Sequence, residues 1–161
     1  MLRLKQILAT GFGSGYIPAA PGTAGSLLAL IPLWFILETG LWYLPVLFAL
    51  LWSVITLWVS PALCELWGDD PPRIVSDEWA GMAIVYITFP AESEPGESLL
   101  FFIAGFLLFR IFDILKPFGI KKLQDRPSGW GILLDDILAG FYGLMCLKTL
   151  IFAWPKIQGL V

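Results

Sequence analysis

Two adjacent acids inside an apolar stretch are the strongest chemical signal in this sequence. Asp135 and Asp136 lie within GWGILLDDILAG, where almost every other side chain is apolar or small. A carboxylate in the middle of a membrane helix costs about 2.5–3.5 kcal/mol on insertion scales, and less near the membrane surface. Packing alone offers no good reason for the pair, so it indicates a functional site. Ala139 and Gly140 follow and are small enough to let a second helix approach closely.

A cation–acid–cation pattern occurs in the segment FRIFDILKPFGIKK. Arg110, Asp113 and Lys116 recur every three residues along one predicted helix, which Pro117 should end. Such a set can be a salt-bridge ladder along the helix surface. It equally suits a phosphate held by the two cations beside a metal ion held by the acid. The residues alone leave both interpretations open.

Two more neighbouring acids stand at the mouth of another apolar run, in DDPPRIVSDEWAG. Asp77 and Glu78 lie directly against Trp79. Asp69 and Asp70 begin the same segment, and hydration at a membrane edge explains them about as well as a function does. Asp77 and Glu78 are therefore the candidates for a site.

A glycine- and proline-rich segment, GFGSGYIPAAPGTAGS, leads into an apolar run that should be helical as far as Leu37. Thr23 or Ser26 is its predicted N-cap. Backbone N–H groups at such a helix start, from Gly22 to Ser26, can receive a phosphate. Neither GxGxxG nor GK[ST] is present, so this is not a nucleotide-binding fingerprint. A phosphate-binding loop and a structural re-entrant turn fit the segment about equally well.

The absence of histidine restricts the chemistry. It excludes Ser-His-Asp hydrolysis, histidine nucleophiles and histidine metal ligands. Cys64 and Cys146 lie inside apolar runs and outside any CxxC motif, so a zinc or redox site is not expected. Carboxylates without histidine or thiolate suit a hard cation, and Mg²⁺ is the predicted cofactor. No basic stripe indicates nucleic-acid binding, and no protein partner is inferred.

The composition predicts that these residues are carried by membrane helices. Of the 161 residues 58% are hydrophobic and 14% are charged, and the mean hydropathy is +0.80. Soluble domains average roughly 45–50% apolar and about 25% charged residues. We therefore expect a single domain over residues 1–161. Its fold class should be all-α, a polytopic membrane protein with about four to five apolar helices in one compact bundle. A soluble bundle with an unusually apolar core is the weaker alternative.

The apolar runs indicate where the helices lie. Leu41–Leu63 is long enough to cross a membrane, and Gly131–Trp154 is the last long run. Trp79–Pro90 and Leu99–Phe109 are shorter and are expected to form a hairpin. The first of these two runs is too short for a full span unless flanking residues join it.

Basic residues are concentrated in the connections on one side of the predicted bundle. They are Arg3, Lys5, Arg73, Arg110, Lys116, Lys121, Lys122 and Arg126, whereas the opposite connections carry Glu38, Glu92, Glu94 and Glu97 without lysine or arginine. The positive-inside rule then places the N-terminus and the basic connections in the cytoplasm. Lys148 and Lys156 fit this arrangement less well.

With this topology all four motifs reach the cytoplasmic side of the membrane. Five acids could then converge with Arg110 and Lys116, and these acids are Asp77, Glu78, Asp113, Asp135 and Asp136. Such a cluster of carboxylates could hold Mg²⁺ beside a phosphate group.

The four motifs, in this order and spacing, closely resemble the phosphatidylglycerophosphatase A family. The matching stretches are PAAPGTAGS, PPRIVSDEWAG, FRIFDILKP and GWGILLDDILAG, and the resemblance spans essentially the whole chain. It implies a multi-helical, Mg²⁺-dependent phosphatase of the bacterial inner membrane. Its substrate would be a phospholipid, phosphatidylglycerophosphate, which it would convert to phosphatidylglycerol and inorganic phosphate.

The resemblance also implies roles for the candidate residues. The five acids would hold the metal, and Asp113, Asp135 and Asp136 would be catalytic, with Asp136 as a base for water. Arg110 and Lys116 would bind the phosphate together with N–H groups around Gly22, Thr23 and Ser26. Attack by water and an aspartyl-phosphate intermediate both stay open, although the absence of a DxDx[TV] signature tilts the choice toward water. The main alternative is a cation or proton-coupled membrane transporter that uses intramembrane carboxylates.

Overall fold

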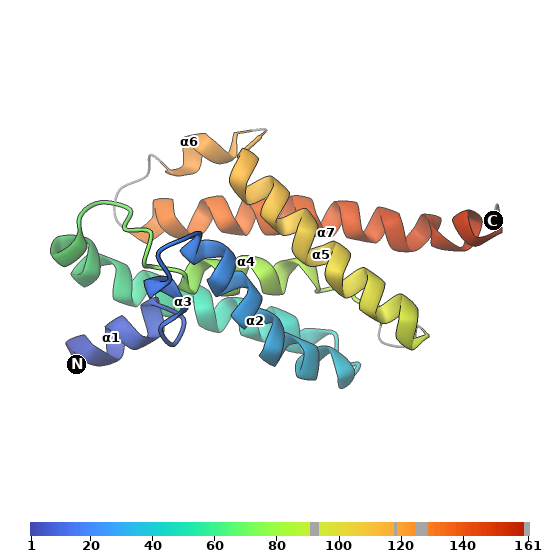
Figure 1. Ribbon diagram of the computed structural model, residues 1–161, viewed down its shortest axis with the longest axis horizontal. Helices are drawn as coiled ribbons and strands as arrows, with labels where there is room; N and C mark the ends of the chain where they lie inside the picture. The colour runs from blue at the N-terminus through green and yellow to red at the C-terminus, as the bar shows by residue number, and fades with distance from the viewer. Residues whose placement is uncertain (91–93, 118, 125–128, 160–161) are drawn as a thin grey trace.

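The computed structural model describes residues 1–90, 94–117, 119–124 and 129–159, and the elements in these ranges are helical. In chain order they are α1 (Leu2–Ala9), the short 3-10 helix η1 (Ser14–Tyr16), α2 (Pro21–Glu38), α3 (Tyr43–Trp67), α4 (Ser76–Val85), α5 (Pro95–Leu115), α6 (Ile120–Gln124) and α7 (Gly129–Gln158) (Figure 1). The predicted all-α fold is confirmed.

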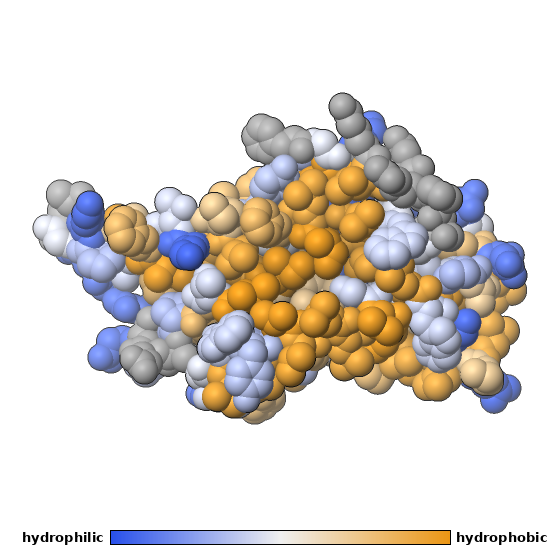
Figure 2. Space-filling model, turned by 180° about the vertical axis from the view of Figure 1, so that it is seen from behind, coloured by the Kyte–Doolittle hydropathy of each residue, from blue (hydrophilic) through white to orange (hydrophobic). Residues whose placement is uncertain are grey.

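Four helices, α2, α3, α5 and α7, are long and apolar enough to cross a membrane. The apolar character of the outer surface agrees with helices that cross a membrane. Figure 2 shows a broad apolar surface across the middle of one face, with hydrophilic residues gathered toward both ends. Large apolar side chains such as Phe35, Val54 and Phe152 are more than 60% exposed. A polytopic helical membrane protein is therefore the fold that the structure supports.

The first run of the predicted hairpin forms α4, which is too short to cross a membrane, as the length of that run indicated. It has ten residues and ends at Val85, so its length is about 15 Å against a hydrocarbon thickness of roughly 30 Å. Residues 86–90 are not helical, and α5 begins at Pro95, earlier than the predicted Leu99. Figure 1 shows α4 in the middle of the bundle and the start of α5 at the end of the molecule farther from the N-terminus.

The short helix α4 forms the centre of the core. Nine of its ten residues are buried, and it packs against both α3 and α7. The Trp79 ring lies against Trp52 of α3 with the centroids 4.3 Å apart. At its far end the Tyr86 hydroxyl donates a hydrogen bond of 2.6 Å to the carbonyl oxygen of Phe102 on α5. These contacts fix α4 to the helices that surround it.

Small residues allow α4 and α7 to approach closely. A Cβ atom added at Gly140 would collide with the backbone carbonyl of Gly81, and one added at Gly81 would lie 2.7 Å from the carbonyl oxygen of Asp136. Gly140 and Ala139 are both buried. The predicted close approach of a second helix at these residues is confirmed, and that helix is α4.

The N-terminal part of the chain differs from the prediction in two respects. Helix α2 begins at Pro21, not at Thr23 or Ser26, and its N-cap is Ala20 with a φ of 54°. Proline suits the first helical position because an N–H group at this position has no hydrogen-bond partner within the helix, so its absence costs nothing. Helix α1 was not predicted at all. Its last residue, Ala9, accepts a hydrogen bond of 2.8 Å from the N–H of Val75, just before α4.

The charged residues of the described chain fall at the two ends of the bundle much as expected. Arg73, just before α4, and Lys116, just after α5, lie at the end that carries α1. Glu97 lies at the other end, where it accepts hydrogen bonds from Trp154 and Gln158 of α7. Glu92 and Arg126, which also entered the topology argument, lie outside the described residues.

Replacing Gly140 by alanine should destabilise the protein, because the added methyl group has no space against Gly81. Overpacking of this kind costs about 1–3 kcal/mol. Gly96→Ala is the matched control, since a Cβ atom at Gly96 of α5 meets nothing within 4 Å. Thermal unfolding in detergent should give a lower midpoint for Gly140→Ala and an unchanged or slightly higher one for Gly96→Ala. Equal midpoints for the two variants would show that α4 and α7 do not pack as described.

Candidate active site

Four helices end around one polar pocket of about 360 Å³. The N-terminal ends of α2, α4 and α7 contribute to it, as does the C-terminal end of α5. All five predicted acids line it together with the two predicted cations and Gly22: they are Gly22, Asp77, Glu78, Arg110, Asp113, Lys116, Asp135 and Asp136. The structure therefore brings together the motifs that lie far apart in the sequence.

The five carboxylates are buried although they border a pocket. Their exposed fractions lie between 3% for Asp136 and 8% for Asp113. Asp77 and Glu78 occupy the first turn of α4, where the positive end of the helix dipole favours negative charge. Buried carboxylates need compensating partners, because the loss of hydration is costly. The positions of the cationic side chains therefore determine which of these carboxylates are compensated.

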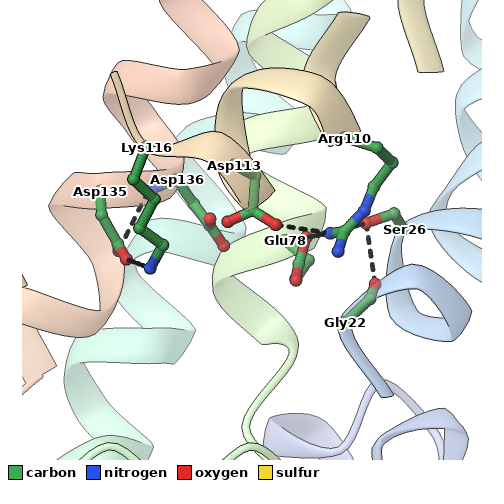
Figure 3. A network of polar contacts seen from close by, with 8 residues as sticks. All are labelled: Gly22, Ser26, Glu78, Arg110, Asp113, Lys116, Asp135 and Asp136. Atoms are coloured by element: carbon green, nitrogen blue, oxygen red, sulfur yellow. Dashed lines mark hydrogen bonds and ion pairs between the residues drawn. The ribbon is translucent and has the colours of Figure 1, made fainter. Parts of the chain in front are cut away.

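Arg110 joins two of the acids. Its Nη1 atom lies 2.6 Å from Oε2 of Glu78 and 2.9 Å from Oδ2 of Asp113, one turn further along α5. The same nitrogen donates to the hydroxyl oxygen of Ser26 at 3.2 Å. Figure 3 shows the guanidinium between the ends of these side chains. Arg110 thus links α5 to α4 and α2.

The start of α2 is shaped to hold Glu78. The Ser26 hydroxyl lies 2.8 Å from Oε2 of Glu78 and 2.9 Å from the carbonyl oxygen of Gly22, and it can donate to one of them at a time. A Cβ atom at Gly22 would collide with Oε1 of Glu78, so only glycine allows this approach. Ser26 is fully buried and does not line the pocket. Its side chain therefore positions Glu78, and direct binding of phosphate by Ser26 stays a prediction.

Lys116 neutralises one of the tandem aspartates. It follows the last residue of α5 and adopts a left-handed conformation with a φ of 43°. Its Nζ atom lies 2.6 Å from Oδ2 of Asp135. Pro117 follows, and the predicted end of the helix at this proline is confirmed to within a residue or two. The predicted set of Arg110, Asp113 and Lys116 serves two separate ion-paired groups and is not a simple ladder along α5.

Asp136 lies between these two ion-paired groups (Figure 3). Among the residues that the structure describes, it forms no ion pair. Carboxylate oxygens of Glu78, Asp113 and Asp136 lie within 4.8 Å of one another, close enough to bind one cation together. The Oδ1 atom of Asp77, also buried at the pocket, has no hydrogen-bond partner in the described part of the chain. A site built only of carboxylate oxygens, one of them without a partner, suits a hard divalent cation.

Burial and mutual repulsion raise the pKa of the acids on α4. The pKa of Glu78 is raised to about 7, first by loss of hydration and then by the nearby Asp113, although Arg110 and Ser26 oppose the shift. Loss of hydration also raises the pKa of Asp77 well above its ordinary value, and the charges of Glu78 and Asp135 add to the effect. Without a metal ion, both acids therefore lose their protons at a higher pH than usual.

Two parts of the pocket differ from what the sequence indicated. Thr23 does not line it, so its predicted role rests on its backbone N–H near the start of α2 and stays a prediction. Asp70, Pro71, Pro72 and Ile74 do line it. For Asp70 the sequence left hydration at a membrane edge and a function about equally open. The adjacent prolines, which cannot continue a helix, were the available signal that this connection folds back over the site.

The family model and two of the named relatives point to one family. A model of the family described as phosphatidylglycerophosphatase A matches residues 7–151. Two proteins named phosphatidylglycerophosphatase A are similar to the chain. The one from Escherichia coli is 36% identical over 93% of this chain and 85% of its own length. The one from Haemophilus influenzae is 39% identical over 90% of this chain and 87% of its own length. A Bacteroides thetaiotaomicron protein, provisionally named a phosphatidylinositol-3-phosphatase, is 40% identical over 91% of this chain and 92% of its own length. No solved structure matches.

The raised pKa values predict how stability depends on pH when metal is absent. Glu78 has an ordinary pKa of 4.5 and a folded value of about 7, so between these values the folded protein binds more protons than the unfolded one. Stability should therefore fall as pH rises through this range. In EDTA and detergent, the unfolding midpoint should be higher at pH 5 than at pH 8.

A Glu78→Gln variant should show a smaller difference between pH 5 and pH 8, because it lacks one of the titrating groups. A midpoint that rises with pH in EDTA would mean that these acids are not buried against one another as described.

Proposed function

Because this chain belongs to the phosphatidylglycerophosphatase A family, we propose that it hydrolyses the phosphate monoester of phosphatidylglycerophosphate. The products are phosphatidylglycerol and inorganic phosphate. The observation that carries this proposal is a pocket with six acids, five of them buried, and two cations at one end of a bundle of apolar helices. Such a pocket suits a charged headgroup whose lipid part remains in the membrane.

Mg²⁺ is the proposed cofactor, and Glu78, Asp113 and Asp136 are its proposed ligands, with Asp77 and Asp135 nearby. The close approach of the three carboxylates and the partnerless oxygen of Asp77 support this assignment. Hard oxygen ligands suit Mg²⁺, which also binds substrate phosphates. When bound, the ion would polarise a phosphoryl oxygen and make water more acidic.

The phosphate is held by groups from α2 and α5. Lys116 and Arg110 line the pocket and supply positive charge. The N–H groups of Gly22 and Thr23 belong to the first turn of α2, where N–H groups have no partner inside the helix. Ala20, Pro21 and Gly22 line the pocket, so this helix start borders the space available for a phosphate. Donors placed in this way stabilise charge on the phosphoryl group in the transition state.

Asp136 is the proposed general base. Glu78 and Asp113 share Arg110, and Asp135 is paired with Lys116, whereas Asp136 forms no ion pair with a described residue. It takes a proton from water as the water oxygen bonds to phosphorus. The phosphorus–oxygen bond to the glycerol breaks, and the glycerol oxygen accepts a proton from solvent water. Asp136 returns its proton to solvent after the phosphate departs.

The site is proposed to face the cytoplasm from the bacterial inner membrane. Arg3, Lys5, Arg73, Lys116 and Lys121 lie at the end of the bundle that carries the pocket. Lysine and arginine are enriched in short cytoplasmic segments of membrane proteins. This topology supports access to a lipid in the inner leaflet.

The transport alternative fits the structure less well. Transport sites lie near the middle of the membrane, commonly where helices are interrupted. Here the acids lie near one end of the bundle, in the first two turns of α4 and α7 and the last turn of α5, and two cations accompany them. A phosphatase site at one membrane surface accounts for both features.

Asp136→Asn should lower the rate of phosphate release from phosphatidylglycerophosphate by about 10²–10⁴-fold, the usual contribution of a general base. Asp69→Asn is the matched control, because Asp69 is exposed and does not line the pocket. The assay uses purified protein in detergent with added Mg²⁺, and EDTA should stop the reaction. An Asp136→Asn enzyme as fast as the control would remove Asp136 from the mechanism.

A second substrate, phosphatidylinositol-3-phosphate, merits a direct comparison because of the provisional name of the Bacteroides relative. We expect kcat/KM to favour phosphatidylglycerophosphate. The secondary phosphate on an inositol ring needs more room beside the prolines of the pocket than a terminal phosphate on glycerol. Preferential hydrolysis of the inositol lipid, measured in matched micelles, would reverse the assignment of substrate while leaving the phosphatase activity intact.

A further inference from the structure

An apolar groove of about 400 Å³ lies between α2 and α5. Its lining consists of Leu30, Ile31, Trp34, Phe35, Leu99 and Phe102. The Trp34 and Phe102 rings meet edge to face with centroids 4.9 Å apart and join the two helices across the groove. Ile31, Phe35 and Leu99 are each more than 45% exposed, so the groove is open to its surroundings. Both helices are long and apolar enough to cross a membrane, so a bilayer around them would place hydrocarbon at the groove.

The same two helices connect the groove to the polar pocket. Gly22 of α2 and Arg110 of α5 line the pocket, and each helix then runs to the groove. At the rise of an α-helix, Gly22 lies about 12 Å from Leu30, and Arg110 lies about 12 Å from Phe102. Figure 1 shows α2 and α5 leaving the end that holds the site and running toward the opposite end. Along both α2 and α5, the groove therefore lies deeper in the membrane than the pocket.

We infer that this groove holds one acyl chain of the lipid whose phosphate monoester occupies the pocket, an inference that rests on the proposed function. A phospholipid bound in this way places its phosphate among the acids and its headgroup along the intervening turns of α2 and α5. Its acyl chain then lies against Trp34 and Phe102.

The groove should orient the lipid more than it increases affinity. A hydrocarbon chain gains little by leaving other lipid chains for an apolar groove, since the two environments are equally apolar. A chain fixed between two helices nevertheless restricts the position of the attached headgroup, and misplacement by about 1 Å can cost 10²-fold in rate. The effect of blocking the groove should therefore appear in kcat/KM for long-chain substrates.

Filling the groove tests this inference. Ile31→Trp adds a large ring at one wall and Leu99→Trp adds one at the other. Val54→Trp is the matched control, because Val54 is 64% exposed on α3, which does not border the groove. The probes are dipalmitoyl and dihexanoyl phosphatidylglycerophosphate in the same detergent, with thermal unfolding measured for each variant.

Both groove variants should lose about tenfold or more in kcat/KM on the dipalmitoyl lipid, as expected for a misplaced headgroup, and less than about twofold on the dihexanoyl lipid. Val54→Trp should match the unmodified protein on both. Equal losses on the two lipids, no loss on either, or a changed oligomeric state on size-exclusion chromatography would each overturn the inference. If the unmodified protein hydrolyses neither lipid, the proposed function itself fails, and this result is distinct from the others.

Discussion

The rest of the structure depends on the burial of five carboxylates opposite two cationic side chains, Arg110 and Lys116, among the residues that the structure describes. Arg110 and Lys116 satisfy Glu78, Asp113 and Asp135. Asp136 has no ion pair with a described residue, and Asp77 keeps an oxygen without a partner. Removing a partner from a buried ion pair costs about 3–5 kcal/mol, which gives the scale of uncompensated charge. A bound divalent cation would offset the excess of negative charge. The buried negative charge that destabilises the metal-free protein is therefore also the feature that suits it to bind a cation beside a phosphate.

The fold serves this constraint through one short helix. Because α4 is only ten residues long and is surrounded by other helices, its first turn carries Asp77 and Glu78 into the interior at one end of the bundle. Close approach at Gly81 and Gly140 brings α7, with Asp135 and Asp136, to the same level. Gly22 then lets the start of α2 close over Glu78. Small residues thus set the distances among the charged ones.

Much of this arrangement could be predicted from the sequence, because each motif stands where an apolar run begins or ends. Such boundaries lie near a membrane surface, and the charge pattern assigns them to one side. The start of α2 could not be found from capping preferences, since Ala20 takes an unusual positive φ before Pro21. The end of α4 at Val85 could not be predicted either, because the sequence stays largely apolar as far as Phe89. In the structure Tyr86, directly after α4, forms a hydrogen bond to α5. The role of Ser26 depends on Glu78, 52 residues away, which no local rule reveals.

Direct binding of a divalent ion tests the central claim most closely. Mn²⁺, a paramagnetic substitute for Mg²⁺, can be titrated into the detergent-solubilised protein and followed by electron paramagnetic resonance. The account predicts tight binding by the unmodified protein and by Asp69→Asn, and a loss of that binding when Asp113 and Asp136 are both changed to asparagine. Equal binding by all three proteins would show that the carboxylates of α5 and α7 do not share an ion.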